Sequence, residues 1–221
     1  MIYTESKPIE EILESLSAEK NIFLLACNGC ADVCETGGEV ALSAMQEELK
    51  KAGKKVTGTA LVDFLCNKIL VATKLAREMK DLKKADSVLA LTCGIGVQAV
   101  SKVVDKVVRP AANTVSLGGM QGLWPSDERC AACGDCALDY TGGICPITFC
   151  AKSLLNGPCG GAQDGKCEVD SEKDCGWQLI YERLEKIGRL ENLKKAYKPR
   201  DHSKMLPSEN LRKTSFYDLE K

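Results

Sequence analysis

Short apolar runs alternate with helical spacings of apolar residues between positions 20 and 120. Four runs rich in aliphatic and β-branched residues predict strands at 21–27, 54–60, 85–93 and 113–117. The segments 37–53, 63–79 and 94–108 place apolar side chains three and four positions apart, which predicts helices. Because strands that alternate with helices form βαβ units, the sequence predicts an α/β fold with a small, four-stranded parallel sheet. The pattern leaves the strand order open.

The first residues of the chain predict a capped amphipathic helix. Ser6 suits the N-cap and Pro8 the first turn, and the apolar residues that follow share one helical face: Ile9, Ile12, Leu13 and Leu16. A basic stretch followed by an apolar run is absent from this sequence, so we do not expect a signal peptide.

Residues 121–176 lose this periodicity and are dominated by Gly, Cys, Pro and Asp. Such a stretch cannot bury a core of its own, so we expect bound metal to supply its folding free energy. A helical pattern returns from Asp174 to Tyr197 with an apolar stripe that serves either a partner or the chain itself: Trp177, Ile180, Tyr181, Leu184, Ile187 and Leu190. We therefore predict an α/β domain over 1–120, an irregular cysteine-rich cluster domain with a C-terminal helix over 121–198, and an extended tail over 199–221.

The composition of the chain argues against several classes of function. The formal net charge is −1, which argues against a nucleic-acid partner bound by bulk charge. No apolar stretch in the sequence reaches eighteen residues, so no membrane span is expected and we predict a cytoplasmic protein. In that reducing compartment, thirteen cysteines indicate metal binding or redox chemistry rather than disulfides.

Eight cysteines in the C-terminal half predict two four-cysteine sites. The run C-x2-C-x2-C at 130–136 is typical of a [4Fe–4S] cluster, whose fourth cysteine is often followed by proline, as in Cys145-Pro146. Zinc prefers paired cysteines and is the less favoured alternative. Spacing leaves open which cluster Cys145 serves. The predicted ligands are Cys130, Cys133, Cys136, Cys145, Cys150, Cys159, Cys167 and Cys175.

Five further cysteines gather where the predicted strands end or the next helices begin. The carboxyl ends of parallel strands meet at one edge of a sheet, so these residues can converge. They are candidates for a third [4Fe–4S] cluster or a zinc ion, and a buried group without metal is a further reading: Cys27, Cys30, Cys34, Cys66 and Cys93. The one histidine, His202, lies in the polar tail, and the sequence offers no G-x-G-x-x-G fingerprint and no acid–base pair. We therefore expect no substrate chemistry from this chain alone and assign no catalytic residue.

Three motifs resemble the C-terminal domain associated with methylenetetrahydrofolate reductase. They are NGPCGG at 156–161, GKCEV at 165–169 and CGWQLIYERL at 175–184. With CNGCADVC at 27–34 and LTCGIGVQ at 91–98, the whole chain resembles the small iron–sulfur subunits of the two-subunit reductases of acetogenic bacteria.

This resemblance implies an electron-transfer subunit. Its partner would be a catalytic subunit that holds FMN or FAD and reduces methylenetetrahydrofolate to methyltetrahydrofolate, with a ferredoxin or further electron-input subunits as donors. The alternative is a zinc-stabilised subunit that only assembles or tethers its partner.

Overall fold

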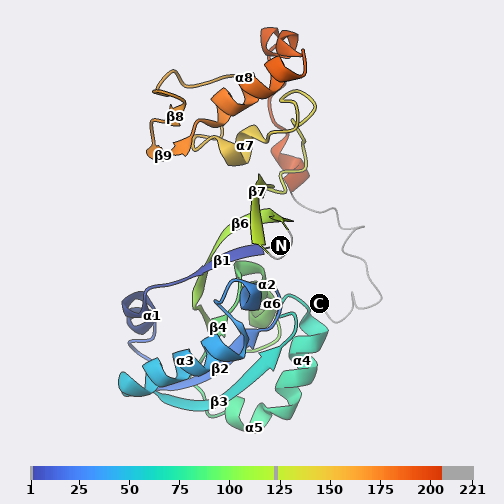
Figure 1. The fold of residues 1–221 in the computed structure, drawn as a ribbon. Coiled ribbons are helices and arrows are strands. Elements are labelled where there is room, and N and C mark those ends of the chain that lie inside the picture. Colours follow the sequence, from blue (N-terminus) through green and yellow to red (C-terminus); the bar gives the residue numbers. More distant parts are fainter. Residues whose placement is uncertain (1, 122–123, 206–221) are drawn as a thin grey trace. The chain divides into compact units, whose positions relative to one another are not determined.

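The computed structural model describes residues 2–121 and 124–205. The chain divides into two compact units, Met1–Gly118 (unit 1) and Gly119–Lys221 (unit 2). Figure 1 shows the elements of both units along the chain. Residues 206–221, which include most of the predicted tail, lie outside the described residues.

A four-stranded parallel sheet forms the centre of unit 1 and confirms the predicted α/β class. Its strand order is β3-β2-β4-β5. The strands are β2 (Asn21–Cys27), β3 (Lys55–Val62), β4 (Ser87–Leu91) and β5 (Val107–Pro110). The central strand β2 is buried on both sides, which explains why NIFLLAC reads as a continuous apolar run.

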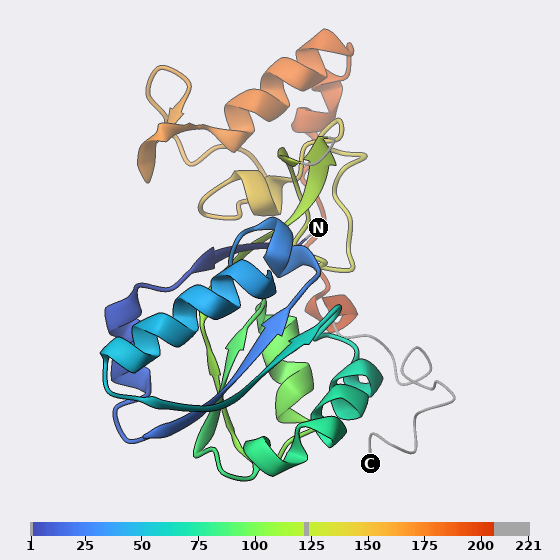
Figure 2. The same ribbon diagram turned by 60° about the horizontal axis from the view of Figure 1, so that its bottom comes forward.

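Helices cover both faces of this sheet (Figure 2). Alternate residues of β2 divide between two cores, with Phe23 and Leu25 in one and Ile22 and Leu24 in the other. The first core includes side chains of α4 (Lys68–Arg77), α5 (Met79–Leu82) and α6 (Gly94–Ser101). The second includes side chains of α1 (Ile9–Ser15) and α3 (Gly38–Lys51). Unit 1 is therefore a three-layer sandwich.

Two parts of the strand prediction are wrong. Residues 113–117 do not join the parallel sheet, because β6 (Ala112–Gln121) pairs antiparallel with β1 (Ile2–Ser6). The helix predicted over 94–108 ends at Ser101, and β5 takes the fourth place by pairing Ser87 with Val107. The valines near 104–108 fit the period of a helix and that of a strand equally well, so the apolar pattern alone led to the wrong assignment.

The N-terminal helix is shorter than predicted. α1 begins after Pro8, and no side chain caps it; Ser6 instead ends β1. β1 was missed because IYTES is short and polar, although Thr4 is buried and its hydroxyl lies 2.6 Å from that of Thr36. Farther along, the side chain of Asn67 caps α4 by accepting from the Ile69 and Leu70 N–H groups.

Unit 2 contains little regular structure. Its elements are β7 (Trp124–Arg129), α7 (Pro146–Phe149), the hairpin β8 (Lys166–Cys167) and β9 (Asp170–Asp174), α8 (Gly176–Lys186) and two 3-10 helices, η1 (Leu190–Lys194) and η2 (His202–Met205).

The long C-terminal helix predicted to Tyr197 stops at Lys186. Gly188 has φ +66°, a left-handed conformation that ends helices readily in glycine. The stripe on α8 packs within the chain: Trp177, Ile180 and Leu184 are buried, whereas Tyr181 is 43% exposed.

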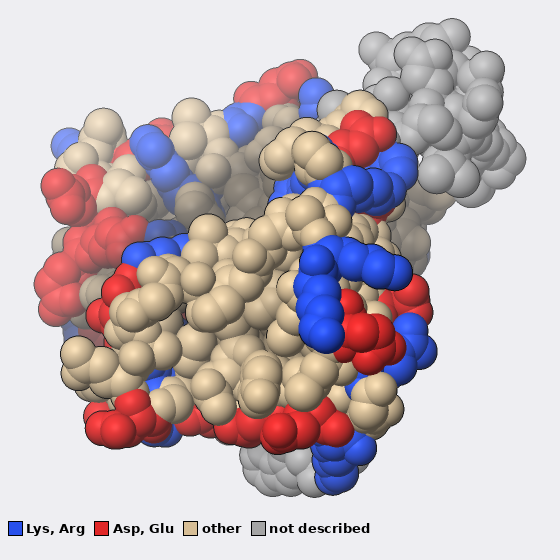
Figure 3. Space-filling view, turned by 90° about the horizontal axis from the view of Figure 1, so that it is seen from above, with Lys and Arg blue, Asp and Glu red and all other residues tan. Residues whose placement is uncertain are grey.

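Charged residues of both signs lie on the surface. Lys and Arg mix with Asp and Glu on the face shown in Figure 3, and neither sign covers it. Within the described residues, no helix has the length and apolar character needed to cross a membrane.

Candidate metal centres

The carboxyl edge of the parallel sheet carries cysteines from separate parts of unit 1. Cys27 ends β2, and Cys93 follows β4 by two residues and precedes α6. β2 and β4 are neighbours, with Ala26 opposite Leu91, so their ends lie at the same edge. Cys30 begins the short helix α2 (Cys30–Val33). The topology thus brings distant sequence segments to one place.

Cys66 joins this group from the loop after β3. Burial of its sulfur raises the pKa of the Cys66 thiol although the residue is partly exposed, and the charges of Cys27, Cys93 and Cys30 raise it further. The loop is held close, because the Cys27 thiol donates to the Asp63 carbonyl over 3.7 Å. We call Cys27, Cys30, Cys66 and Cys93 the N-terminal set.

Gly29 permits this close approach. A Cβ on Gly29 would lie 2.8 Å from the Asp63 carbonyl oxygen and 2.9 Å from the Phe64 ring. Any larger residue would push the 63–66 loop away from the start of α2. The spacing of the cysteines gives no signal for this requirement.

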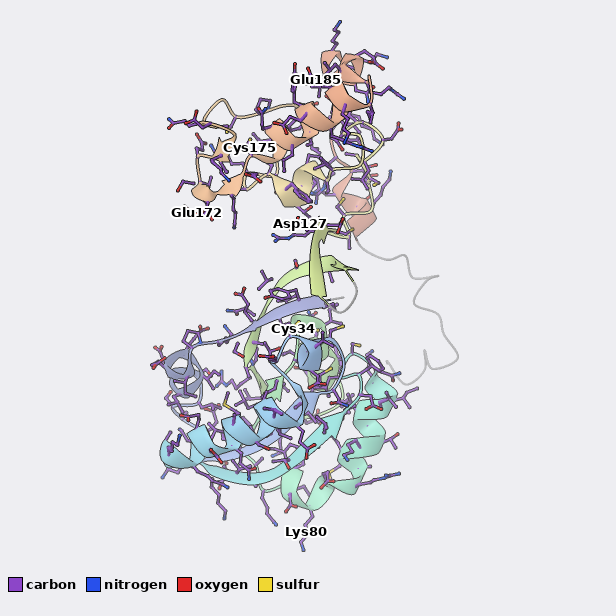
Figure 4. All side chains as sticks on the ribbon, in the orientation of Figure 1. Cys34, Lys80, Asp127, Glu172, Cys175 and Glu185 are labelled. Atoms are coloured by element: carbon purple, nitrogen blue, oxygen red, sulfur yellow. The ribbon has the colours of Figure 1, made fainter. Side chains whose placement is uncertain are left out.

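Cys34 lies one helical turn from Cys30, since its N–H donates to the Cys30 carbonyl over 3.2 Å. It follows α2, and its thiol donates to the Ile2 carbonyl of β1 over 3.7 Å. Figure 4 labels Cys34 beside this strand. The sequence grouped Cys34 with the other four cysteines as a candidate ligand, and the structure gives its thiol a hydrogen bond to a strand that the sequence did not predict.

In unit 2, four of the eight predicted ligands line one cavity: Cys150, Cys159, Cys167 and Cys175. We call them the second C-terminal set. Cys175 is buried and directly precedes α8, so its sulfur lies where a helix favours negative charge. Lys152 and Glu168 form an ion pair that lines the same cavity.

Close backbone packing assembles the second C-terminal set. A Cβ on Gly176 would lie 2.6 Å from the Phe149 carbonyl carbon and 2.8 Å from the Cys150 nitrogen, so glycine lets Cys150 approach Cys175. The Cys175 N–H donates to the Gly165 carbonyl over 2.7 Å. Through this bond the β8–β9 hairpin, and with it Cys167, is held beside the start of α8.

The NGPCGG segment that carries Cys159 is anchored on both sides. The Trp177 indole N–H donates to the Leu154 carbonyl over 3.0 Å. The Asn156 side chain accepts from the Tyr197 N–H and donates to the Tyr197 carbonyl. Gly157 and Gly160 have φ of +106° and +82°, which glycine tolerates. The loop around Cys159 is thus fixed by residues outside the motif.

Of the other four C-terminal cysteines, three lie within the CAACGDC turn at 130–136 and the fourth, Cys145, follows it. Ala132 and Gly134, with φ of +49° and +73°, reverse the backbone between the cysteines. The Ala132 N–H lies 3.3 Å from the Cys130 sulfur, the kind of backbone donor that stabilises a sulfur-bound cluster. We call Cys130, Cys133, Cys136 and Cys145 the first C-terminal set.

Two threonines bring Cys145 to this turn. The buried Thr141 hydroxyl lies 3.1 Å from the Ala137 carbonyl and 2.6 Å from the Ile144 carbonyl. These carbonyls adjoin Cys136 and Cys145 in sequence. The Thr148 hydroxyl donates to the Arg129 carbonyl over 3.0 Å, which links α7 to the residue before Cys130. Since Cys145 does not line the cavity of the second set, these links favour membership in the first.

Residues 198–204 pack against the same turn. Asp135 is buried and pairs with Lys198 and Lys204 at 3.1 and 3.4 Å. The hydrogen bond from Lys198, together with that from the Asp201 N–H, lowers the pKa of the Asp135 carboxyl. The start of the predicted tail thus covers the segment between Cys133 and Cys136.

All thirteen cysteines lie within the described residues, and each is a free thiol. In this described part, no three His, Cys, Asp or Glu side chains stand at the spacing for one metal ion. The three sets are therefore defined by shared cavities, hydrogen bonds and electrostatic proximity.

Comparison with known proteins bears on unit 2. Residues 109–203 match the family described as methylene-tetrahydrofolate reductase C terminal. The match includes the eight cysteines of both C-terminal sets and confirms the family resemblance for this part of the chain. It associates the chain with methylenetetrahydrofolate reductase. None of the curated proteins and none of the solved structures matches the chain.

Proposed function

We propose that the chain is the iron–sulfur small subunit (MetV) of a methylenetetrahydrofolate reductase complex. The observation that carries the proposal is the cavity in the family-matched region that four of its eight cysteines line together. Four thiolates per site are the usual ligands of a [4Fe–4S] cluster. The first and second C-terminal sets would each hold one.

The residues of both sets suit thiolate ligands. Cys175 lies at the N-terminal end of an 11-residue helix, and the sulfur of Cys130 accepts a hydrogen bond from the Ala132 N–H. Lys152 adds a positive charge at the second set, partly balanced by Glu168. Such clusters, when bound, supply one-electron transfer.

The N-terminal set would hold a third [4Fe–4S] cluster or a zinc ion, with Cys34 outside it. Cys30 and Cys93 adjoin helix N-termini, and Cys27 and Cys93 are buried at the sheet edge. These surroundings suit thiolates of either site. Metal analysis of Cys66→Ser decides between them, because the variant should lose iron in one case and zinc in the other.

The partner in this proposal is a flavin-containing catalytic subunit with FMN or FAD. Reduction of methylenetetrahydrofolate to methyltetrahydrofolate takes two electrons and two protons. A flavin can collect two electrons one at a time from this subunit, which would receive them from a ferredoxin or a further electron-input subunit. This division of labour accounts for a chain with no acid–base pair of its own.

Anaerobic purification with iron analysis and EPR tests the proposal. We expect about eight irons from the C-terminal sets, and about twelve if the N-terminal set also holds a cluster. Reduced protein should then reduce the flavin of the catalytic subunit. Protein that holds zinc and no iron would contradict the proposal and favour an assembly or tethering role.

Single cysteine variants test the ligand sets. Cys133→Ala and Cys145→Ala should each remove the same cluster signal, and Cys150→Ala should remove the other. Cys34→Ala is the matched control and should retain all metal. If Cys145→Ala abolished the signal that Cys150→Ala abolishes, the assignment of Cys145 would be wrong.

A further inference from the structure

An open groove lies next to the second C-terminal set. We call it the Tyr181 groove; residues that line it include Tyr140, Gly157, Pro158, Gln178, Tyr181 and Leu193. Tyr181 and Gln178 are exposed on α8, which Figure 4 shows with Cys175 labelled at its start. Trp177 and Leu184, which the sequence offered as partner anchors, are instead buried in the core of unit 2.

The Tyr181 groove presents uncharged surface. Each of the described residues that line it is neutral, although 28% of the chain is charged. Three of its polar side chains are engaged with the chain itself: the Tyr140 hydroxyl donates to the Lys195 carbonyl, the Trp177 indole to the Leu154 carbonyl, and the Gln178 amide to Glu182. What remains is aromatic, aliphatic and glycine surface, which fits an apolar side chain.

The groove shares a wall with the cavity of the second C-terminal set. Pro158, Ala162, Cys175 and Trp177 line both. A molecule in the groove therefore touches Cys175 and the residue before Cys159. In the proposed function an electron-transfer partner has to approach the cluster ligands closely, and this shared wall offers that approach.

We propose that the flavin-bearing subunit docks at the Tyr181 groove by inserting an apolar side chain against Tyr181. The inference rests on the function proposed above and names the contact through which that function operates. Tyrosines in neutral, desolvated grooves are frequent binding hot spots. A second copy of this chain is a poorer occupant, because it would cover the shared wall without supplying a flavin.

Binding of full-length variants to the catalytic subunit tests the groove. Tyr181→Glu places a charge in it, and Gln178→Arg adds charge and bulk from a second exposed position. Ile187→Glu is the matched control, since Ile187 is 41% exposed, adjoins the same helix and does not line the groove. The readouts are the dissociation constant, the rate of flavin reduction and the iron content.

We expect Tyr181→Glu and Gln178→Arg to weaken binding by about tenfold or more and to slow flavin reduction at unchanged iron content. Ile187→Glu should stay within about twofold of the wild type. Wild-type binding by both groove variants with full iron would overturn the docking proposal and leave the proposed function standing.

If Tyr181→Glu lost iron, its weaker binding could not be assigned to the groove. Gln178→Arg, whose side chain lies outside the core, would then be the test. Binding of Gln178→Arg at wild-type strength would then reject the groove. Absence of iron from the wild-type protein would instead reject the proposed function.

Discussion

Unit 1 buries an aliphatic cluster on each face of a parallel sheet, whereas the buried hydrophobic cluster of unit 2 comprises four side chains at α8. The four are Cys175, Trp177, Ile180 and Leu184. Burial of apolar surface provides most of the favourable free energy of folding, at about 25 cal/mol per Å². Unit 1 therefore has its own source of stability, and unit 2 has a small one.

The backbone of unit 2 also contains more residues in unfavourable conformations than that of unit 1. In unit 2, Ala132, Ser153 and Asp164 adopt positive φ, which costs a residue with a Cβ about 1 kcal/mol each. Among described residues of unit 1, only Glu35 does so outside glycine. The N-terminal set therefore lies on a unit whose hydrophobic core can stabilise its fold. The C-terminal sets lie in a unit whose fold depends more on the cysteine sites themselves.

Metal removal should give the largest effect on this comparison. If the C-terminal sets hold the proposed clusters, removal of these clusters under reducing conditions should accelerate amide exchange in α8 by at least about a hundredfold, because metal–ligand bonds would then contribute the folding free energy that the small core lacks. β2 and β4 should remain protected. Mass-resolved hydrogen exchange measures both. Equal protection of α8 with and without metal would remove the distinction between the units.

A cavity in the sheet core should affect unit 1 alone. Leu25 is fully buried, and Leu25→Ala should lower the free energy of unfolding of unit 1 by about 3 kcal/mol. Val40→Ala is the control, since Val40 is 84% exposed and should change stability by less than about 0.5 kcal/mol. Urea unfolding followed by circular dichroism measures the loss. The iron of the C-terminal sets should be unchanged in both variants; its loss in Leu25→Ala would show that the units depend on each other.

Two glycines that follow cysteines allow a matched test across the units. Gly176 follows Cys175 and Gly94 follows Cys93, each as the first residue of a helix. A Cβ on Gly176 meets the backbone at 2.6 Å, whereas one on Gly94 meets only the Thr114 hydroxyl, at 3.5 Å. Gly176→Ala should therefore cost about 1–3 kcal/mol and remove the metal of the second C-terminal set.

Gly94→Ala should be close to neutral and retain all metal. Metal analysis and thermal unfolding measure both variants. Retention of full metal by Gly176→Ala would show that the contact between Cys150 and α8 can relax.

Asp86 gives the smallest effect and concerns pH. Hydrogen bonds from the Asn21 and Lys20 N–H groups lower the pKa of the Asp86 carboxyl. A carboxyl with a lowered pKa stabilises the fold above its unfolded pKa of about 3.9, and this stabilisation is lost as the pH falls through the folded value. Asp86→Asn should thus be slightly less stable than the wild type at neutral pH, and the difference should shrink in acid. Urea unfolding at several pH values measures it; a constant difference would contradict the assignment.

The sequence alone determined the parts of the molecule in which burial follows a local period. NIFLLAC, the helix after Gly37 and the run before Cys93 lie where the apolar pattern places them, because each buries its side chains against a neighbour within the same sheet sandwich. The predicted strand ends also indicated that Cys27 and Cys93 lie close together, since the carboxyl ends of parallel strands lie at one edge of a sheet. The family resemblance of residues 109–203 was likewise readable from motifs.

Tertiary structure decided what local periodicity cannot encode. It placed 113–117 on β1 rather than in the parallel sheet, gave Cys34 the Ile2 carbonyl as its partner, and buried Trp177 in the chain's own core. It also set the surroundings of the C-terminal cysteines. The Thr141 hydroxyl contacts the Ala137 and Ile144 carbonyls, and Gly176 lets the Cys150 backbone approach α8. Such choices depend on hydrogen bonds and close approaches between distant segments, and spacing along the chain carries no record of them.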